Sequence, residues 1–133
     1  MRDPGIDPEI ERIRQIYHED VLTHRCRDVI LLGRKCAPQI LYTFLGFELK
    51  MGSTRLSCPD MSTARYLKVF AELGMKKVKI PYDLSRLPLL VTGLEHSLHR
   101  IKEHLLERDL NSTRHAAALR RIYARIRRRL PEA

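Results

Sequence analysis

The feature that most limits how this chain can fold is a regular apolar stripe between residues 87 and 105. Its six members are spaced by four, three, four, three and four positions: Leu87, Val91, Leu94, Leu98, Ile101 and Leu105. A helix places such residues along one side, as a seam that packs against a near-parallel helix. We expect this seam to be the interface of a homodimer. The last helix of the same chain is the alternative partner, because it follows after a short turn.

The last predicted helix, residues 114–130, is rich in arginine. It contains seven arginines and no acidic residue before Glu132. The guanidinium group suits phosphate because its planar fork donates two hydrogen bonds at once. Cations also complement the dipole at a helix C-terminus, but one or two would be enough for that. We therefore predict that this helix contacts phosphates through Arg114, Arg120, Arg121, Arg125 and Arg128.

The overall charge points in the same direction. The chain has 25 lysines and arginines against 16 acidic residues, which gives a formal net charge of +9. A surplus of this size in a small domain is typical of proteins with a polyanionic partner. An acidic protein partner, or a charge that serves only solubility, is the alternative explanation.

Residues 47–58 have the pattern of a β-hairpin. Apolar and charged residues alternate up to Met51, and Gly52-Ser53 supplies a two-residue turn in which glycine can adopt positive φ. This turn sets the register, with Met51 opposite Thr54 and Lys50 opposite Arg55. The apolar residues then share one face of the hairpin.

A helix and a strand are expected after the hairpin. Asp60 is a good N-cap for a helix over residues 61–73, and Gly74 is a good terminator. Alternation over residues 76–80 predicts a third strand. A right-handed crossover would make this strand parallel to the second, which gives a small three-stranded mixed sheet. This region carries a second candidate phosphate-binding surface, without exposed aromatics for base stacking: Lys50, Arg55, Arg65, Lys68, Lys77 and Lys79.

The N-terminal third is expected to be helical. Asp7 and Pro8 favour a helix start, and apolar residues continue at helical spacing to Val21. The pattern either continues or restarts through residues 26–30, with Gly33 as a terminator. Residues 38–45 suit either a strand or a short helix, and we favour the helix.

Evidence for catalysis in the sequence is sparse. Glu48-Leu49-Lys50 resembles the strand-borne Glu-x-Lys of metal-dependent nucleases related to restriction endonucleases, and Asp60 would supply the acidic partner. Here the Pro-Asp follows the Glu-x-Lys instead of preceding it. Glu95, His99 and Glu103 share a helix face that could hold a metal, although a solvated face is the simpler explanation. The three cysteines are odd in number and lack C-x-x-C spacing, so we expect neither a disulfide framework nor a zinc ribbon. We also expect no cofactor.

Together these patterns predict a single α+β domain over residues 1–133. It has a helical part (1–45), a hairpin–helix–strand core (46–81) and a long C-terminal helical pair (84–130). The N-terminus lacks the apolar core of a signal peptide, and no stretch could span a bilayer, so a cytoplasmic location is expected. The predicted function is non-enzymatic binding of DNA or RNA. The alternatives are a protein-interaction subunit that docks through its long helix and a small Mg²⁺-dependent nuclease.

Overall fold

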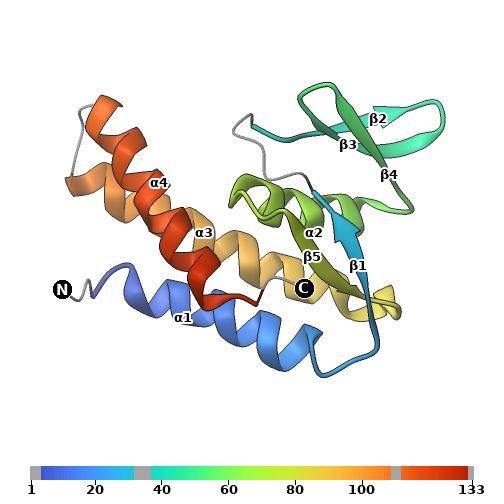
Figure 1. The fold of residues 1–133 in the computed structure, drawn as a ribbon, viewed down its shortest axis with the longest axis horizontal. Coiled ribbons are helices and arrows are strands. Elements are labelled where there is room, and N and C mark those ends of the chain that lie inside the picture. The colour runs from blue at the N-terminus through green and yellow to red at the C-terminus, as the bar shows by residue number, and fades with distance from the viewer. Residues whose placement is uncertain (1–3, 32–36, 109–111, 132–133) are drawn as a thin grey trace.

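The computed structural model describes residues 4–31, 37–108 and 112–131 and shows the α+β fold that the sequence predicts (Figure 1). In chain order its elements are α1 (Asp7–Gln15), the π-helix η1 (Ile16–Val21), β1 (Cys26–Ile30), β2 (Gln39–Thr43), β3 (Gly46–Met51), β4 (Thr54–Cys58), α2 (Met61–Glu72), β5 (Lys77–Pro81), the 3-10 helix η2 (Leu84–Arg86), α3 (Leu87–Arg108) and α4 (Ser112–Arg129). None of the helices in the described ranges combines the length and hydropathy that a bilayer span requires.

The strands form two separate antiparallel sheets instead of one mixed sheet. β2, β3 and β4 make a three-stranded sheet, and β1 pairs with β5 in a two-stranded one. The expectation that the third predicted strand runs parallel to the second is therefore wrong. β5 instead pairs with β1, in a register that places Val29 opposite Val78. Both valines are buried, and their contact helps to select this pairing.

Two N-terminal segments that were expected to be helical are strands. Residues 26–30 form β1, and β2 lies within the segment 38–45, where it pairs with β3. The helix predicted from Asp7 does reach Val21, although its last six residues adopt π-helical geometry. The expected terminator Gly33 lies outside the described residues. Short apolar runs are compatible with both a helix and a strand, and here pairing with strands that are distant in sequence determines the structure.

The hairpin and the helix after it agree with the prediction in detail. Met51 lies opposite Thr54 and Lys50 opposite Arg55, and Gly52 at the turn has a φ of 62°. The Asp60 side chain accepts a hydrogen bond of 2.7 Å from the Thr63 amide and so caps α2. These elements depend on local signals, which explains why the sequence predicts them well.

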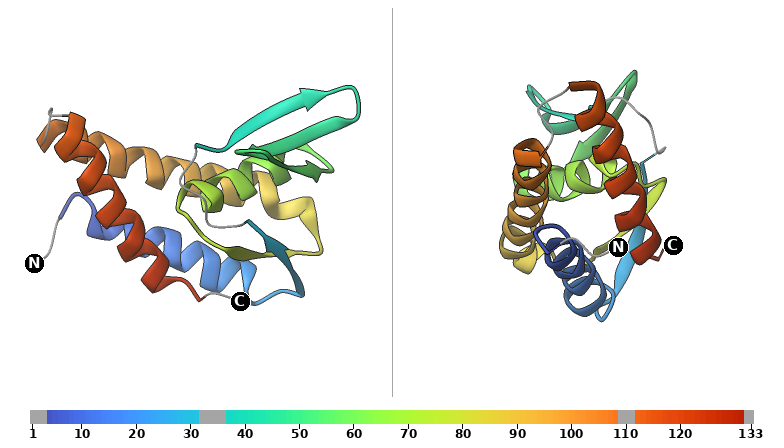
Figure 2. Two further views of the ribbon diagram at one scale, coloured as in Figure 1. Left: turned by 45° about the horizontal axis from the view of Figure 1, so that its top comes forward. Right: turned by 90° about the vertical axis from the view of Figure 1, so that its left-hand side faces the viewer.

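The seam of α3 is covered within a single chain. All six predicted seam residues are at most 4% exposed, because α3 packs against α1, α2 and α4. Figure 2 shows α1 and α2 flanking α3 along much of its length. Most of the contacts of α3 are with α1 and α2, whereas the sequence suggested that α3 packs only against α4 or against a second copy of the chain. A homodimer stays a prediction, and it would need a surface other than this seam.

Two buried tyrosines hold the backbone of β5. The Lys79 amide donates a 3.0 Å hydrogen bond to the Tyr17 hydroxyl, and the Tyr66 hydroxyl donates one of 2.7 Å to the Lys79 carbonyl. Both tyrosine side chains are completely buried, and each contacts Phe70 at the centre of the core. These bonds fix β5 to η1 on one side and to α2 on the other.

Candidate nucleic-acid interface

The arginine-rich helix α4 lies across α3 and α1 at one end of the molecule (Figure 2). Its apolar side is buried through Ile122 and Ile126, and Leu130 just after the helix is buried as well. The Tyr123 hydroxyl donates a 2.6 Å hydrogen bond to Glu72 at the end of α2. Burial and this carboxylate together raise the pKa of Tyr123. One side of α4 is thus fixed to the body of the protein.

Three arginines flank this apolar side and bind the rest of the protein. Arg125 forms an ion pair with Asp7, and Arg129 forms one of 2.6 Å with Glu11. Arg127 donates a 2.5 Å hydrogen bond from Nη1 to the carbonyl oxygen of Leu73 at the C-terminus of α2. Arg125, which helical spacing places on the same side as Arg121 and Arg128, is thus held by a carboxylate of α1 and remains only partly exposed.

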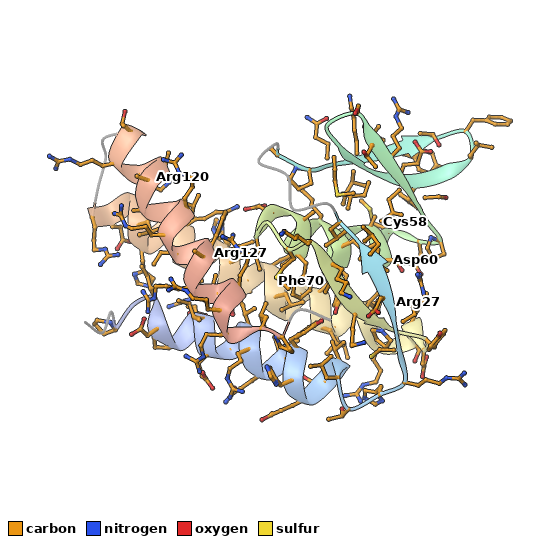
Figure 3. All side chains as sticks on the ribbon, in the orientation of Figure 1. Arg27, Cys58, Asp60, Phe70, Arg120 and Arg127 are labelled. Atoms are coloured by element: carbon orange, nitrogen blue, oxygen red, sulfur yellow. The ribbon has the colours of Figure 1, made fainter. Side chains whose placement is uncertain are left out.

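The other four arginines of α4 are exposed on its outer side: Arg114, Arg120, Arg121 and Arg128. Arg120 and Arg121 form no ion pair or hydrogen bond with any residue that the structure describes. Arg128 donates to the carbonyl of Ala124 in its own helix, at 3.3 Å. Arg114, Arg121 and Arg128 are seven positions apart, about two turns or 10 Å each. They form one row of cations along the helix. Figure 3 labels Arg120, which lies about midway along α4, and Arg127, which lies nearer its C-terminal end.

The residues of the second predicted basic surface come from two sheets and a helix. Lys77 and Lys79 belong to the two-stranded sheet, whereas Lys50 and Arg55 belong to the three-stranded sheet. Arg65 and Lys68 are on α2. A lysine-rich face of a single sheet, as expected from the sequence, is therefore wrong.

Several of these cations are also paired with carboxylates. Arg65 binds Glu95 of α3 through two nitrogens, Lys79 binds Asp28 at 2.9 Å, and Arg55 lies 3.4 Å from Glu48. The hydrogen bond from Lys79 holds the pKa of Asp28 below its ordinary value. Phosphate would have to compete with these carboxylates.

The residues proposed for catalysis or metal binding are engaged elsewhere. Glu48 pairs with Arg55, and Asp60 caps α2. Glu95 is bound to Arg65, so it does not join His99 and Glu103, which lie 3.2 Å apart. Within the described ranges, no group of three histidine, cysteine or acidic side chains is placed to hold a metal ion.

Three aromatic side chains are exposed among the described residues, and the sequence indicated only Tyr82 as a candidate. Tyr42 is 80% exposed, Phe44 is fully exposed and Tyr82 is 56% exposed. Residues 38–45 were predicted to form a helix, which would bury part of this apolar run. The exposure of Tyr42 and Phe44 was therefore not predicted. The glycine at position 46 was the available signal, since Thr43 to Gly46 forms the turn between β2 and β3.

No known protein-family model matches this chain, and no similar curated protein or solved structure was found. The function has to be inferred from the residues and their placement.

Proposed function

We propose that this protein binds nucleic acid without catalysing a reaction, and that the outer side of α4 is its main phosphate contact. The supporting observation is that the arginines of α4 fall into two groups, one bound to the rest of the protein and one exposed. Arg125, Arg127 and Arg129 are bound to the body of the protein, whereas Arg120, Arg121 and Arg128 are exposed to solvent. α4 contains no acidic residue, so nothing on the helix itself neutralises the outer row.

The chemistry of the row suits a phosphate backbone. Guanidinium groups bind phosphate oxygens through two parallel hydrogen bonds and keep their charge at any physiological pH. Neutralising phosphates releases condensed counterions, so affinity should fall steeply as salt increases. The net charge of +9 adds long-range attraction to a polyanion.

Fluorescence anisotropy with a labelled duplex, titrated over a series of KCl concentrations, tests this proposal. Replacing Arg120, Arg121 and Arg128 together by Gln should weaken binding at low salt. It should also reduce the slope of log affinity against log salt by about one for each arginine that no longer binds a phosphate. Lys76→Gln is the control, because it removes an exposed cation that lies outside α4.

Two outcomes would count against the proposal. One is a wild-type protein that binds neither duplex nor single strand at low salt. The other is a triple variant with wild-type affinity and an unchanged salt slope. The alternative of a subunit that docks through α3 has lost its main support, because the seam is covered within the chain.

A further inference from the structure

The turn between β2 and β3 presents apolar side chains to solvent in a fixed arrangement. Phe44 and Leu45 form the tip, and Leu45 is 87% exposed. The Thr43 hydroxyl accepts a 3.2 Å hydrogen bond from the Leu45 amide and donates one of 3.1 Å to the Gly46 carbonyl. Gly46 has a φ of 115°, which favours glycine. These two hydrogen bonds and the positive φ of Gly46 define the shape of the turn.

A row of aromatic side chains begins at this tip. The rings of Tyr42 and Phe47 are 5.1 Å apart between centroids, and they are paired across β2 and β3. Phe47 in turn is opposite Cys58 on β4. Paired residues in antiparallel strands share a face, so these three side chains form a line across the sheet. Tyr42, at its outer end, offers most of its ring to solvent.

The line leads to arginines on the neighbouring sheet. Burial raises the pKa of the Cys58 thiol, the Asp60 carboxylate raises it further, and the Arg27 guanidinium lowers it. Figure 3 shows Cys58, Asp60 and Arg27 following one another at the junction of the two sheets. Asp60 is occupied by the amide at the start of α2, whereas Arg27 is exposed.

A second aromatic side chain follows Arg27. Arg25 is two positions earlier in the same extended segment and so shares its face. Its guanidinium carbon is 5.1 Å from the centroid of the Tyr82 ring, which is the geometry of a cation–π contact. The backbones of these two residues are joined as well, by a 2.9 Å hydrogen bond from the Tyr82 amide to the Arg25 carbonyl.

We propose that this row, Tyr42, Phe47, Arg27, Arg25 and Tyr82, binds a single strand of nucleic acid. Bases would stack on the exposed rings of Tyr42 and Tyr82, with Phe47 packed behind Tyr42, and the two arginines would contact the phosphates between them. Surfaces that combine stacking aromatics with cations are typical of single-strand binding. The bases of a duplex are already stacked on each other, so protruding rings gain little from it. The row lies at the opposite end of the molecule from the start of α4 (Figure 1).

This inference rests on the proposed function only in sharing its ligand class, and its test uses different residues. Anisotropy is measured with a labelled oligothymidine and with a labelled hairpin duplex. Tyr42→Ala and Tyr82→Ala should each weaken single-strand binding roughly tenfold. Duplex binding and the salt slope should be unchanged. Arg27→Gln should lower the slope for the single strand by about one. Leu106→Ala is the control, because it removes an exposed apolar side chain near the end of α3.

The outcomes separate the two proposals. If the tyrosine variants bind oligothymidine as the wild type does, while the α4 triple variant is weakened, the row is not a single-strand site and the proposed function stands. If neither nucleic acid binds the wild type, both proposals fail. The inference would also be overturned if the wild type did not bind oligothymidine but bound anionic lipid vesicles through Phe44. Circular dichroism of each variant confirms that its fold is intact.

Discussion

Arg125 in α4 forms an ion pair with Asp7 in the first turn of α1, across 118 positions of sequence. One turn further along each helix, Arg129 repeats this contact with Glu11. The two pairs align α4 with the N-terminal helix, and they remove two arginines from the surface available to an anion. The acidic residues that set this arrangement are at the other end of the chain.

The Arg125–Asp7 pair should contribute modestly to stability. In a double-mutant cycle with Asp7→Asn and Arg125→Gln, we expect a coupling energy of about 0.2 to 1 kcal/mol, since both side chains are partly exposed. Urea denaturation measures the free energy of unfolding for each variant. The cycle of Asp7→Asn with Arg121→Gln should be additive, and a coupling of equal size there would contradict the assignment.

Asp60→Ala should destabilise the fold by about 1 kcal/mol, because the amide of Thr63 loses its acceptor at the start of α2. The change appears as a lower urea midpoint with an unchanged slope. Asp60→Asn should retain most of the stability, since asparagine caps helices about as well. If Asp60→Asn destabilised the fold as much as Asp60→Ala does, the loss of the carboxylate charge, and not of the capping hydrogen bond, would explain the effect. We expect no metal-dependent activity for the alanine variant to lose.

Leu98→Glu should unfold the chain at any protein concentration, because it places an unpaired charge where the side chain is only 4% exposed. Such a charge costs several kcal/mol. Leu106→Glu, on the exposed side of the same helix, should remain folded. Circular dichroism and sedimentation distinguish the two. A Leu98→Glu protein that is folded but dissociated would instead show that the seam joins two copies.

Stability should also decline at alkaline pH. Burial raises the pKa of Tyr17 and of Tyr66 above their ordinary value of 10.0. The folded state therefore holds these protons more tightly than the unfolded state does. This contribution is fully present below pH 10 and is lost as the pH rises from there towards the raised values.

Tyr66→Phe tests this pH dependence. Its stability should fall less steeply above pH 10, even though removing the hydrogen bond to Lys79 makes it less stable by about 1 kcal/mol at neutral pH. Urea denaturation at several pH values gives both quantities, and the absorbance of tyrosinate reports the titration without interference from tryptophan, which is absent. Parallel stability curves for the two proteins would show that Tyr66 does not contribute.

The parts of the fold that the sequence predicted correctly are those governed by neighbouring residues. Gly52 sets the register of the hairpin, and Asp60 and Gly74 bound α2. β1 could not be found in the same way. Its residues become a strand because β5, some fifty positions later, offers a partner, and no local pattern contains that information.

The same difference between local and distant determinants applies to the candidate site. Helical spacing groups Arg121, Arg125 and Arg128 on one side of α4, but it does not indicate that Asp7 pairs with Arg125. Tyr42 is likewise 80% exposed although its cross-strand partner Phe47 packs against the core, and a single sequence does not indicate this difference. Contacts between distant segments decide which charges and rings remain available to a ligand.

The two tyrosine hydroxyls on Lys79 have a consequence for how the molecule behaves at high concentration. Asp28 and Lys79 are opposite each other, and the amide and carbonyl of Lys79 point away from β1, towards the outer edge of the ribbon. An open strand edge is a template on which another chain can add as an extra strand. Here the hydroxyls of Tyr17 and Tyr66 occupy the amide and the carbonyl at the middle of that edge, which an added strand would need for pairing. Tyr17 and Tyr66 thus anchor β5 to the core and also hinder self-assembly of the protein through that edge.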